Sequence, residues 1–543
     1  MDTKDQKSDE KSSAEIISTK ETTIVDTTPA PVSFSTYLHF ARLQRQEERD
    51  TPLPPPRGLT RWLRNLLGRK NAPSRAIPLS EKETASRALR LASWSSAFYL
   101  ITTDILGPFN APFAISQVGW VPGIILYYIM GIVALYTGLL LWHLFVRLDS
   151  LRYPIRSYAD IVERILGMGA RRVSTVLQSV QLIVVVGIIC LANAQALVQI
   201  AKHHICFSVA IVIWALLGMV LGQIRTLKNY ASLSNMAIWL NLLLIFSSMG
   251  FVAHSPPNFA AALSSLGVPA GPVKTQLFAS VPLFSQVNGI MNMVYAYGGC
   301  MIFPEIMAEM RRPMDFWKGM IAAQALIFSA YVLYGAFVYS QQGQFVLPLA
   351  YQGVSRYALQ TFGNVISLIS GIIAAGLYGN IGIKVVYHNV IEDWFHGPPV
   401  MSSKGRYIWS TMVCSYWALA FIVGSAIPQV QTINGLIGAV AIMQFTYTFP
   451  PLLHFGFDVI NDAMVADYDP INGQYRPVDT WKQGSRWRRA LFSGRWYFKL
   501  FNLVLFLASM SMAGLGMWAA GESAKATFAM SGAATSFGCR APV

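Results

Sequence analysis

Long apolar stretches separated by short polar segments dominate the chain from residue 92 onward. Each stretch has roughly 17–28 residues, which is the length that a helix needs to cross a hydrocarbon layer about 30 Å thick. The pattern therefore predicts an all-α polytopic membrane protein with eleven transmembrane helices. The expected spans are residues 92–118, 121–146, 173–200, 206–222, 230–253, 284–309, 318–340, 358–383, 407–426, 430–453 and 497–520.

The first span contains a break in its middle, where Gly107, Pro108 and Pro112 fall within six residues. Proline lacks an amide donor and disfavours the helical conformation of the residue before it, so a regular helix cannot pass through this stretch. Irregular backbone at membrane depth persists only where protein buries it or where it lines a watery cavity. Asp104 stands one turn before the break, and an acid at this depth indicates a functional site. A proline-kinked structural helix is the alternative interpretation.

The sixth span repeats this arrangement with the pair Gly298 and Gly299, followed by Pro304 and the acid Glu305. Gly299 lies 192 positions after Gly107, and the second break falls five spans after the first. The two interrupted helices are therefore expected to cross the membrane in opposite directions, as in transporters built from inverted repeats. The sequence predicts a five-plus-five inverted repeat with broken helices 1 and 6, plus one extra C-terminal helix.

The two breaks supply groups that can hold a charged solute at mid-bilayer. The first amides after an interruption carry partial positive charge and can bind a carboxylate, while freed carbonyls can hold an ammonium or another cation. A zwitterionic α-amino acid has both of these charges. The aromatic residues Tyr295, Tyr297, Phe109 and Phe303 could line a pocket or could simply pack. The candidate substrate-binding residues are Gly107, Pro108, Phe109, Asn110, Ala111, Tyr297, Gly298 and Gly299.

Asp104 and Glu305 are the candidate residues for coupling or gating. Ionisable side chains inside a membrane often carry protons in transporters, which favours this role for Glu305 and leaves it open for Asp104. The alternative is that each carboxylate accepts structural hydrogen bonds from amides that the helix breaks set free. The sequence leaves both interpretations open.

The polar segments divide the chain into regions around this core. Residues 1–91 lack apolar periodicity and are expected to form a disordered cytoplasmic tail. Within the tail, residues 57–70 fit either a short basic helix on the membrane surface or a linker. The remaining regions are a transporter core at 92–455, a basic cytoplasmic loop at 456–496, a last helix at 497–520 and a short extracytoplasmic tail at 521–543.

Composition and charge agree with a membrane protein and orient it. The chain is 53% hydrophobic and 13% charged, whereas soluble proteins are about 25% charged. With a cytoplasmic N-terminus, all but five of the 42 basic residues lie on the cytoplasmic side, in accord with the positive-inside rule. The net charge of +15 therefore reflects topology, and no nucleic-acid partner is expected. The five exceptions are Lys202, Lys274, Arg356, Lys525 and Arg540.

Signatures of an enzyme or of a cofactor site are missing from the sequence. The five cysteines show no metal-binding spacing, so they imply neither a zinc site nor a disulfide framework. Zinc-protease motifs and nucleophile elbows do not occur. We therefore expect neither enzymatic activity nor a cofactor or bound metal.

Several motifs resemble the amino acid/auxin permease family, and in particular its fungal neutral amino acid permease branch within the amino acid–polyamine–organocation superfamily. The likeness covers about residues 90–455 and is strongest between residues 105 and 170. The motifs that carry it are Gly107–Ala114, Gln117–Gly123, Ala134–Gly138, Arg152–Pro154, Tyr158–Asp160, Thr226–Asn229 and Phe303–Ile306.

The resemblance implies an eleven-span transporter of the leucine-transporter-like fold that moves amino acids with protons. We therefore expect a secondary active transporter that carries neutral, aliphatic or aromatic, amino acids by proton symport, with sodium as the alternative coupling ion. An amino-acid sensor of the same fold and a carrier of polyamines or other organic cations are the alternative functions. The expected location is the plasma membrane, with the vacuolar membrane as the alternative.

Overall fold

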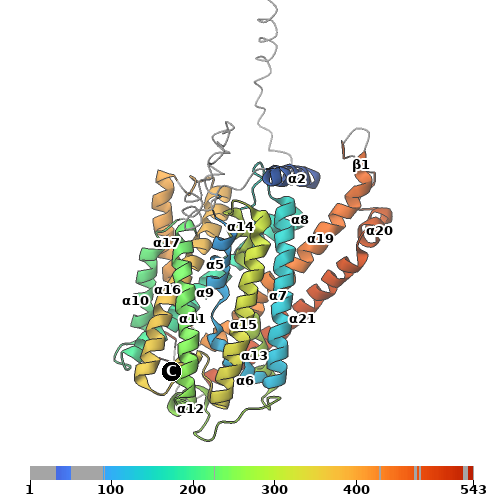
Figure 1. Ribbon diagram of the computed structural model, residues 1–543. Coiled ribbons are helices and arrows are strands. Elements are labelled where there is room, and N and C mark those ends of the chain that lie inside the picture. Colours follow the sequence, from blue (N-terminus) through green and yellow to red (C-terminus); the bar gives the residue numbers. More distant parts are fainter. Residues whose placement is uncertain are drawn as a thin grey trace, which may run out of the picture.

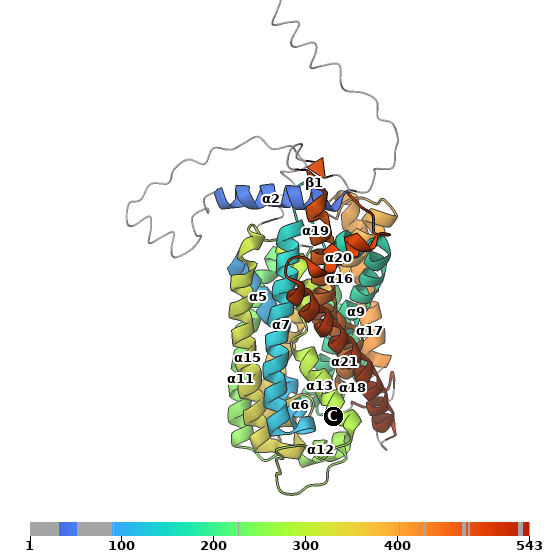
Figure 2. The same ribbon diagram turned by 90° about the vertical axis from the view of Figure 1, so that its right-hand side faces the viewer.

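The computed structural model is an elongated bundle of helices that run largely along one direction (Figure 1 and Figure 2). It describes residues 32–50, 90, 92–225, 227–400, 402–426, 430–469, 474–475, 478–529 and 536–541. Within this part, eight helical segments are long and apolar enough to cross a membrane. They are built from α7 (Trp120–Leu148), α9 (Met168–Ile200), α11 (Leu227–Ala253), α15 (Phe316–Gln342), α16 (Tyr357–Val386), α17 (Ser403–Ala426), α18 (Val430–Ile437) with α19 (Phe449–Met464), and α21 (Trp496–Phe528).

Three of the expected spans correspond to shorter helices. One of them is the single apolar helix α10 (Phe207–Leu221). The other two are interrupted, as α5 (Trp94–Ile105) followed by α6 (Ala111–Val118), and as α13 (Leu283–Ala296) followed by α14 (Phe303–Ala308). Both interruptions lie where the sequence predicts them.

Proline explains why each interrupted span resumes where it does. Pro112 and Pro304 both occupy the first turn of the second half-helix. Amides in the first turn have no intrahelical carbonyl partner, so a proline there removes no hydrogen bond, whereas inside a helix it would remove one. Pro112 and Pro304 therefore favour a new helix beginning at these positions, as α6 and α14, over a continuous helix through the break.

The segment between α18 and α19 contains a third irregularity, which sequence reasoning missed. The expected continuous span at 430–453 instead includes two π-helical turns, Gly438–Ile442 and Gln444–Thr448. A Cβ added at Gly438 would lie 2.9 Å from the carbonyl oxygen of Met291 in α13. Glycine therefore lets α13 and this segment approach more closely than a larger residue would allow.

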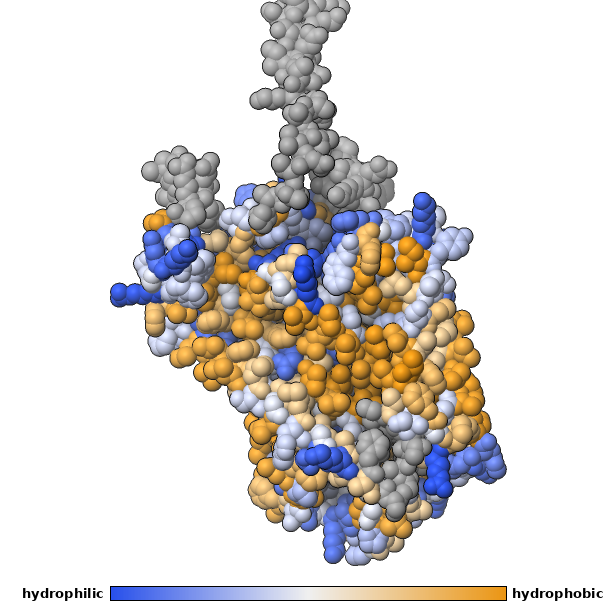
Figure 3. Space-filling model, turned by 180° about the vertical axis from the view of Figure 1, so that it is seen from behind, coloured by the Kyte–Doolittle hydropathy of each residue, from blue (hydrophilic) through white to orange (hydrophobic). Residues whose placement is uncertain are grey.

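Apolar side chains form a band around the middle of the surface seen in Figure 3, and hydrophilic side chains gather toward both ends. Large hydrophobic side chains are exposed on several long helices, including Val176 of α9, Leu216 of α10, Phe246 of α11 and Leu507 of α21. Exposed apolar surface of this extent is what a lipid environment covers. The chain is an integral membrane protein.

Short elements cap the two ends of the bundle (Figure 1 and Figure 2). We call the two ends the α2 face and the α12 face. The α12 face carries α12 (Phe259–Leu266). The α2 face carries α2 (Phe34–Asp50), α8 (Tyr158–Leu166), α20 (Gly484–Phe492) and the antiparallel strands β1 (Tyr468–Asp469) and β2 (Gln474–Tyr475).

Residues 34–50 correct one prediction. They fall in the tail that was expected to be disordered, yet they form helix α2, which lies across the end of the bundle (Figure 2). The buried residues Leu38, Ala41 and Arg45 recur at helical spacing along one side of α2. This buried side is short and includes an arginine, so its apolar periodicity in the sequence was too weak to predict a helix. The basic helix considered at residues 57–70 lies outside the described residues.

Asp149, which directly follows α7, anchors α2. Its fully buried carboxylate lies 3.0 Å from the guanidinium of Arg45 and 2.8 Å from that of Arg90, and it accepts a 3.1 Å hydrogen bond from the amide of Ile155. Burial alone would raise the pKa of Asp149, but Arg90, Arg45 and this amide outweigh it and hold the pKa below its usual range. The network joins α2, Arg90 in the segment before α5, and the loop between α7 and α8.

Cys206 and Cys539 form a disulfide, although the cysteine spacing had implied no disulfide framework. The bond connects the start of α10 with the segment 536–541, which follows α21. Backbone bonds from Phe207 to Cys539 (3.1 Å) and from Phe537 to Ser425 (3.0 Å) hold this segment against α10 and α17. The two cysteines are 333 residues apart, so spacing in the sequence gave no signal for this pair.

Candidate functional site

A cavity of about 200 Å³ lies where the two interrupted helices meet. Its lining comes from both sides of the first break, from α13 and Gly298 of the second, and from the surrounding long helices α9, α11, α15 and α16. Small-molecule sites usually enclose about 300–1,000 Å³, so this cavity fits a small solute. Lysine, arginine and histidine are not among its lining residues in the described part of the chain.

Six of the ten predicted site residues line this cavity, and four do not. Pro108, Tyr297, Gly299 and Glu305 lie outside its lining. The six that line it are Asp104, Gly107, Phe109, Asn110, Ala111 and Gly298. A Cβ added at Gly107 would meet no atom within 4 Å, which shows how open the cavity is at the first break.

Asp104 supplies the acid of the cavity. Both of its carboxylate oxygens are buried, and neither has a hydrogen-bond partner of normal geometry among the described residues. Gly299 packs against it, because a Cβ at Gly299 would lie 2.5 Å from Oδ2 of Asp104. An isolated carboxylate in such surroundings is costly, so it needs either a proton or a cationic partner.

The carbonyl groups at the end of α5 are already occupied. The hydroxyl of Tyr378 donates to the carbonyl of Asp104 (3.4 Å), and that of Tyr331 donates to the carbonyl of Ile105 (2.8 Å). The side-chain amide of Asn241 donates to the carbonyl of Leu106 (2.9 Å). Side chains from α16, α15 and α11 thus satisfy three successive carbonyls that the break sets free.

Amide side chains form the polar part of the wall. Asn110 donates to Asn292 of α13 (2.5 Å), which connects the two interrupted helices. Ser370 of α16 donates to Asn241 (2.5 Å), the residue that also binds the end of α5. Sequence reasoning did not identify Asn241 and Asn292 as site residues. The available signal was that each is an asparagine within an otherwise apolar span. Such residues usually face the bundle interior, but the sequence does not tell which neighbour they meet.

The four candidate aromatic residues separate into two groups. Phe109 and Tyr295 line the cavity, and Phe109 packs edge-on against Tyr334 and Tyr351. Tyr297 instead donates through its hydroxyl to the carbonyl of Tyr127 (3.1 Å). Phe303 packs edge-on against Phe316 of α15. Tyr297 and Phe303 therefore stabilise the bundle around the cavity and do not form its wall.

Glu305 lies toward the α2 face, away from the cavity. Its Oε1 accepts hydrogen bonds from the amide of Tyr158 (3.1 Å) and from the side chain of Gln178 (2.8 Å). Gln178 also donates to the carbonyl of Met301 (3.0 Å). Among the described residues, the second carboxylate oxygen of Glu305 has no partner. The side chain thus connects α14 to the first turn of α8 and to α9.

Residues 90–457 match the family described as transmembrane amino acid transporter protein. A protein named N amino acid transport system protein from Neurospora crassa is 22% identical over 427 residues, which cover 78% of this chain and 82% of that protein. A transmembrane transporter from Gibberella moniliformis is 25% identical over 272 residues, or 48% of this chain, and the match spans about half (54%) of that relative. A solved structure of a Na⁺-coupled sialic acid symporter aligns with 11% identity and a TM-score of 0.44 over 80% of this chain and 93% of that one.

Proposed function

Because this chain belongs to the transmembrane amino acid transporter family, we propose that it is a secondary active transporter that carries neutral amino acids by proton symport. The family and the matched relatives are transporters and not enzymes. The observation that carries the proposal is the buried carboxylate of Asp104, which has no hydrogen-bond partner of normal geometry among the described residues and lies in a small cavity at the meeting point of two interrupted helices.

The substrate is held by groups of opposite sign. The ammonium group of the amino acid pairs with Asp104, and its carboxylate faces the amides that begin the second half of the first interrupted helix, near Asn110. Phe109 and Tyr295 face the side chain of the substrate. The absence of basic residues from the described cavity lining disfavours acidic substrates, because a second carboxylate would have no positive partner.

The proton is the coupling ion that the site supports best. Transporters that couple to sodium coordinate it with carbonyls of an unwound helix. Here the carbonyls of Asp104, Ile105 and Leu106 are each engaged by a side-chain donor. Asp104 pairs with the ammonium of the substrate and Glu305 carries the proton, so both can be bound at the same time, as symport requires.

The eleven spans, with the five-plus-five repeat and an additional last helix, are part of the proposal. The N-terminus and the α2 face are cytoplasmic, and the C-terminus and the α12 face are extracytoplasmic. The basic residues support this orientation, and so does the disulfide between Cys206 and Cys539, because disulfides form in oxidising compartments. The proposed location is the plasma membrane. In a vacuolar membrane, the same topology would release amino acids from the lumen.

The orientation predicts which side can reduce the disulfide. In sealed right-side-out vesicles, a membrane-impermeant reductant followed by an impermeant maleimide should label Cys206 and Cys539. The free cysteines Cys190 and Cys300 are buried, and Cys414, which is exposed, is replaced by serine in the background protein. A Cys206→Ser, Cys539→Ser double variant is the control and should remain unlabelled. Labelling that requires permeabilised vesicles would contradict the orientation.

Glu305→Gln should abolish proton-driven accumulation while sparing exchange of substrate across the membrane. Glutamine keeps the oxygen that accepts from Tyr158 and Gln178, so the links to α8 and α9 survive while the titrating proton is lost. Glu305→Ala removes the accepting oxygen as well as the titrating proton, and it serves as the comparison variant. Equal accumulation by wild type and Glu305→Gln, with a defect confined to Glu305→Ala, would assign Glu305 a structural role alone.

Uptake into proteoliposomes tests the proposed function. Purified protein is supplied with labelled leucine, phenylalanine, glutamate or lysine in sodium-free buffer, with and without an inward proton gradient. Accumulation of leucine and phenylalanine that depends on the gradient is the expected result. Flux of lysine alone would favour the organic-cation carrier. Ligand-dependent thermal stabilisation without flux under any gradient would favour the sensor.

A further inference from the structure

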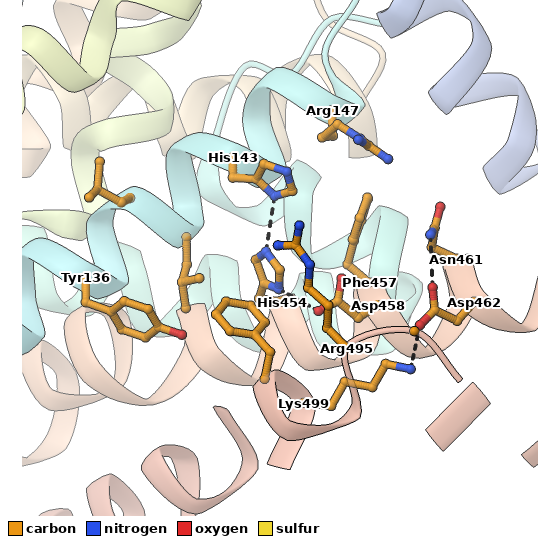
Figure 4. Close-up of a pocket in the computed structure, with 14 residues that line it drawn as sticks. Tyr136, His143, Arg147, His454, Phe457, Asp458, Asn461, Asp462, Arg495 and Lys499 are labelled. Atoms are coloured by element: carbon orange, nitrogen blue, oxygen red, sulfur yellow. Dashed lines mark hydrogen bonds and ion pairs between the residues drawn. The ribbon is translucent and has the colours of Figure 1, made fainter. Parts of the chain in front are cut away.

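A second cavity of about 550 Å³ lies between α7, α19 and α21, toward the α2 face (Figure 4). We call it the lateral cavity. None of its lining residues lines the central cavity. Its lining includes Tyr136, Leu139, Leu140 and Phe498 as well as a group of charged and histidine side chains. The proposed transport cycle uses none of these groups.

Both acids of the lateral cavity already have partners (Figure 4). Asp458 lies 3.0 Å from Nδ1 of His454, whose Nε2 lies 3.1 Å from Nδ1 of His143. Asp462 forms an ion pair with Lys499 at 2.6 Å. This chain of contacts engages the two negative charges and joins α7 and α21 to α19.

Two arginines of the lateral cavity, Arg147 and Arg495, form no ion pair among the described residues. Arg147 lies over the ring of Phe457, 5.7 Å from its centroid, and its Nε is buried without a hydrogen-bond partner. Arg495 reaches toward the histidine pair (Figure 4). The two arginines and Lys499 face two acids, so the cavity carries at least one net positive charge. Its uncompensated donors are guanidinium groups, whose planar geometry matches a phosphate.

The depth of the lateral cavity indicates where such a phosphate would come from. Arg147 is the penultimate residue of α7, and Arg495 directly precedes α21. Trp496 and Tyr497, the first residues of α21, are 52% and 62% exposed. Exposed tryptophan and tyrosine at a helix end are typical of the headgroup level of a membrane. Leu139, Leu140 and Phe498 supply an apolar surface beside the charged groups.

We propose that the lateral cavity binds the phosphate of an anionic phospholipid through Arg147 and Arg495. Basic pockets between transmembrane helices bind anionic headgroups in this way. The apolar part of the lining contacts the glycerol and upper acyl carbons of the lipid, which a free phosphate compound would leave bare. The lipid thus bridges α7 and α21, the last helix.

The test measures lipid binding to the full-length protein in detergent. Native mass spectrometry and thermal unfolding are recorded with phosphatidylinositol, phosphatidylserine or phosphatidylcholine. Binding of the anionic lipids should be at least tenfold weaker in the Arg147→Gln, Arg495→Gln double variant. A matched control, Arg406→Gln with Arg488→Gln, removes two exposed basic residues that line neither cavity, and should bind lipid as the wild type does. Unfolding of each variant without lipid verifies that it is folded.

Three outcomes would overturn the proposal. The first is equal binding of phosphatidylcholine and the anionic lipids by the wild type. The second is equal loss in the two double variants, which would mean that total charge and not this cavity attracts the lipid. The third is that inorganic phosphate or a soluble inositol phosphate binds as tightly as the lipid, which would make a soluble compound the ligand.

The Arg147→Lys, Arg495→Lys variant keeps the charge without the bidentate geometry and should bind the anionic lipids with an affinity between those of the wild type and the Arg147→Gln, Arg495→Gln variant.

Discussion

Asp104→Asn should lower the rate of amino acid transport about 100-fold while the protein remains folded. Asparagine has nearly the same volume but cannot pair ionically with an ammonium or take up a proton at working pH. A hydrogen bond to a charged group contributes about 1.5–3 kcal/mol, and about 2.7 kcal/mol corresponds to a 100-fold change. Because the carboxylate has no other partner of normal geometry in the described chain, little else can compensate for the loss.

Initial rates of uptake, measured against substrate concentration in proteoliposomes, check this expectation. Asp315→Asn is the control, because Asp315 is an acid that pairs with Lys318 at the surface and lies outside the cavity. The loss in Asp104→Asn should appear both in proton-driven accumulation and in exchange, unlike that of Glu305→Gln. Wild-type accumulation by Asp104→Asn would exclude Asp104 from substrate binding and from coupling.

Asp149→Ala should destabilise the α2 face by about 3–5 kcal/mol, which is the usual cost of removing one partner from a buried ion pair. The substitution leaves the guanidiniums of Arg45 and Arg90 without their shared carboxylate and the Ile155 amide without its acceptor. We expect α2 to detach from the bundle, and trypsin to cleave near Arg45 faster than in the wild type. Glu522→Gln, which removes an exposed pair with Lys525, should change neither thermal unfolding nor cleavage.

The pH dependence of α2 docking follows from the same carboxylate. The pKa of Asp149 is depressed in the folded protein, so its stabilisation is fully present above the unfolded pKa of about 3.9 and is lost as pH falls through the lower folded value. Tryptic protection of α2 should therefore stay constant between about pH 5 and 8. Release of α2 within that range would show that another group controls docking.

The sequence predicted where helices run and where they break, because both depend on local chemistry. Runs of apolar residues determine the spans, and Gly107, Pro112, Gly299 and Pro304 determine the interruptions. The positions of the observed helix pairs α5–α6 and α13–α14 agree with this reasoning. The number of residues that a helix needs to cross a membrane likewise does not depend on its neighbours.

The direction in which each side chain points was less predictable, because it depends on how neighbouring helices pack. Tyr297 is adjacent to Gly298 in the chain, yet it binds a carbonyl of α7 while Gly298 lines the cavity. Glu305 follows the second break, but in the first turn of α14 its side chain is directed toward α8. Asn241 and Tyr378 enter the site from helices whose rotation the apolar pattern leaves undetermined. Contacts between distant segments, such as that of α2 with Asp149, gave no local signal at all.

The disulfide has a consequence for how the protein is made. Cys539 is translated 333 residues after Cys206, which takes roughly 17–67 s at about 5–20 residues per second. On the proposed orientation, the thiol of Cys206 waits in an oxidising lumen through that interval and can be captured by another thiol. Its native bond forms once α21 has been inserted and its following segment has crossed to the far side. Oxidation of this pair would therefore indicate that α21, the last helix, has been inserted. A quality-control system could use the free thiol of Cys206 to recognise chains in which this step has not occurred.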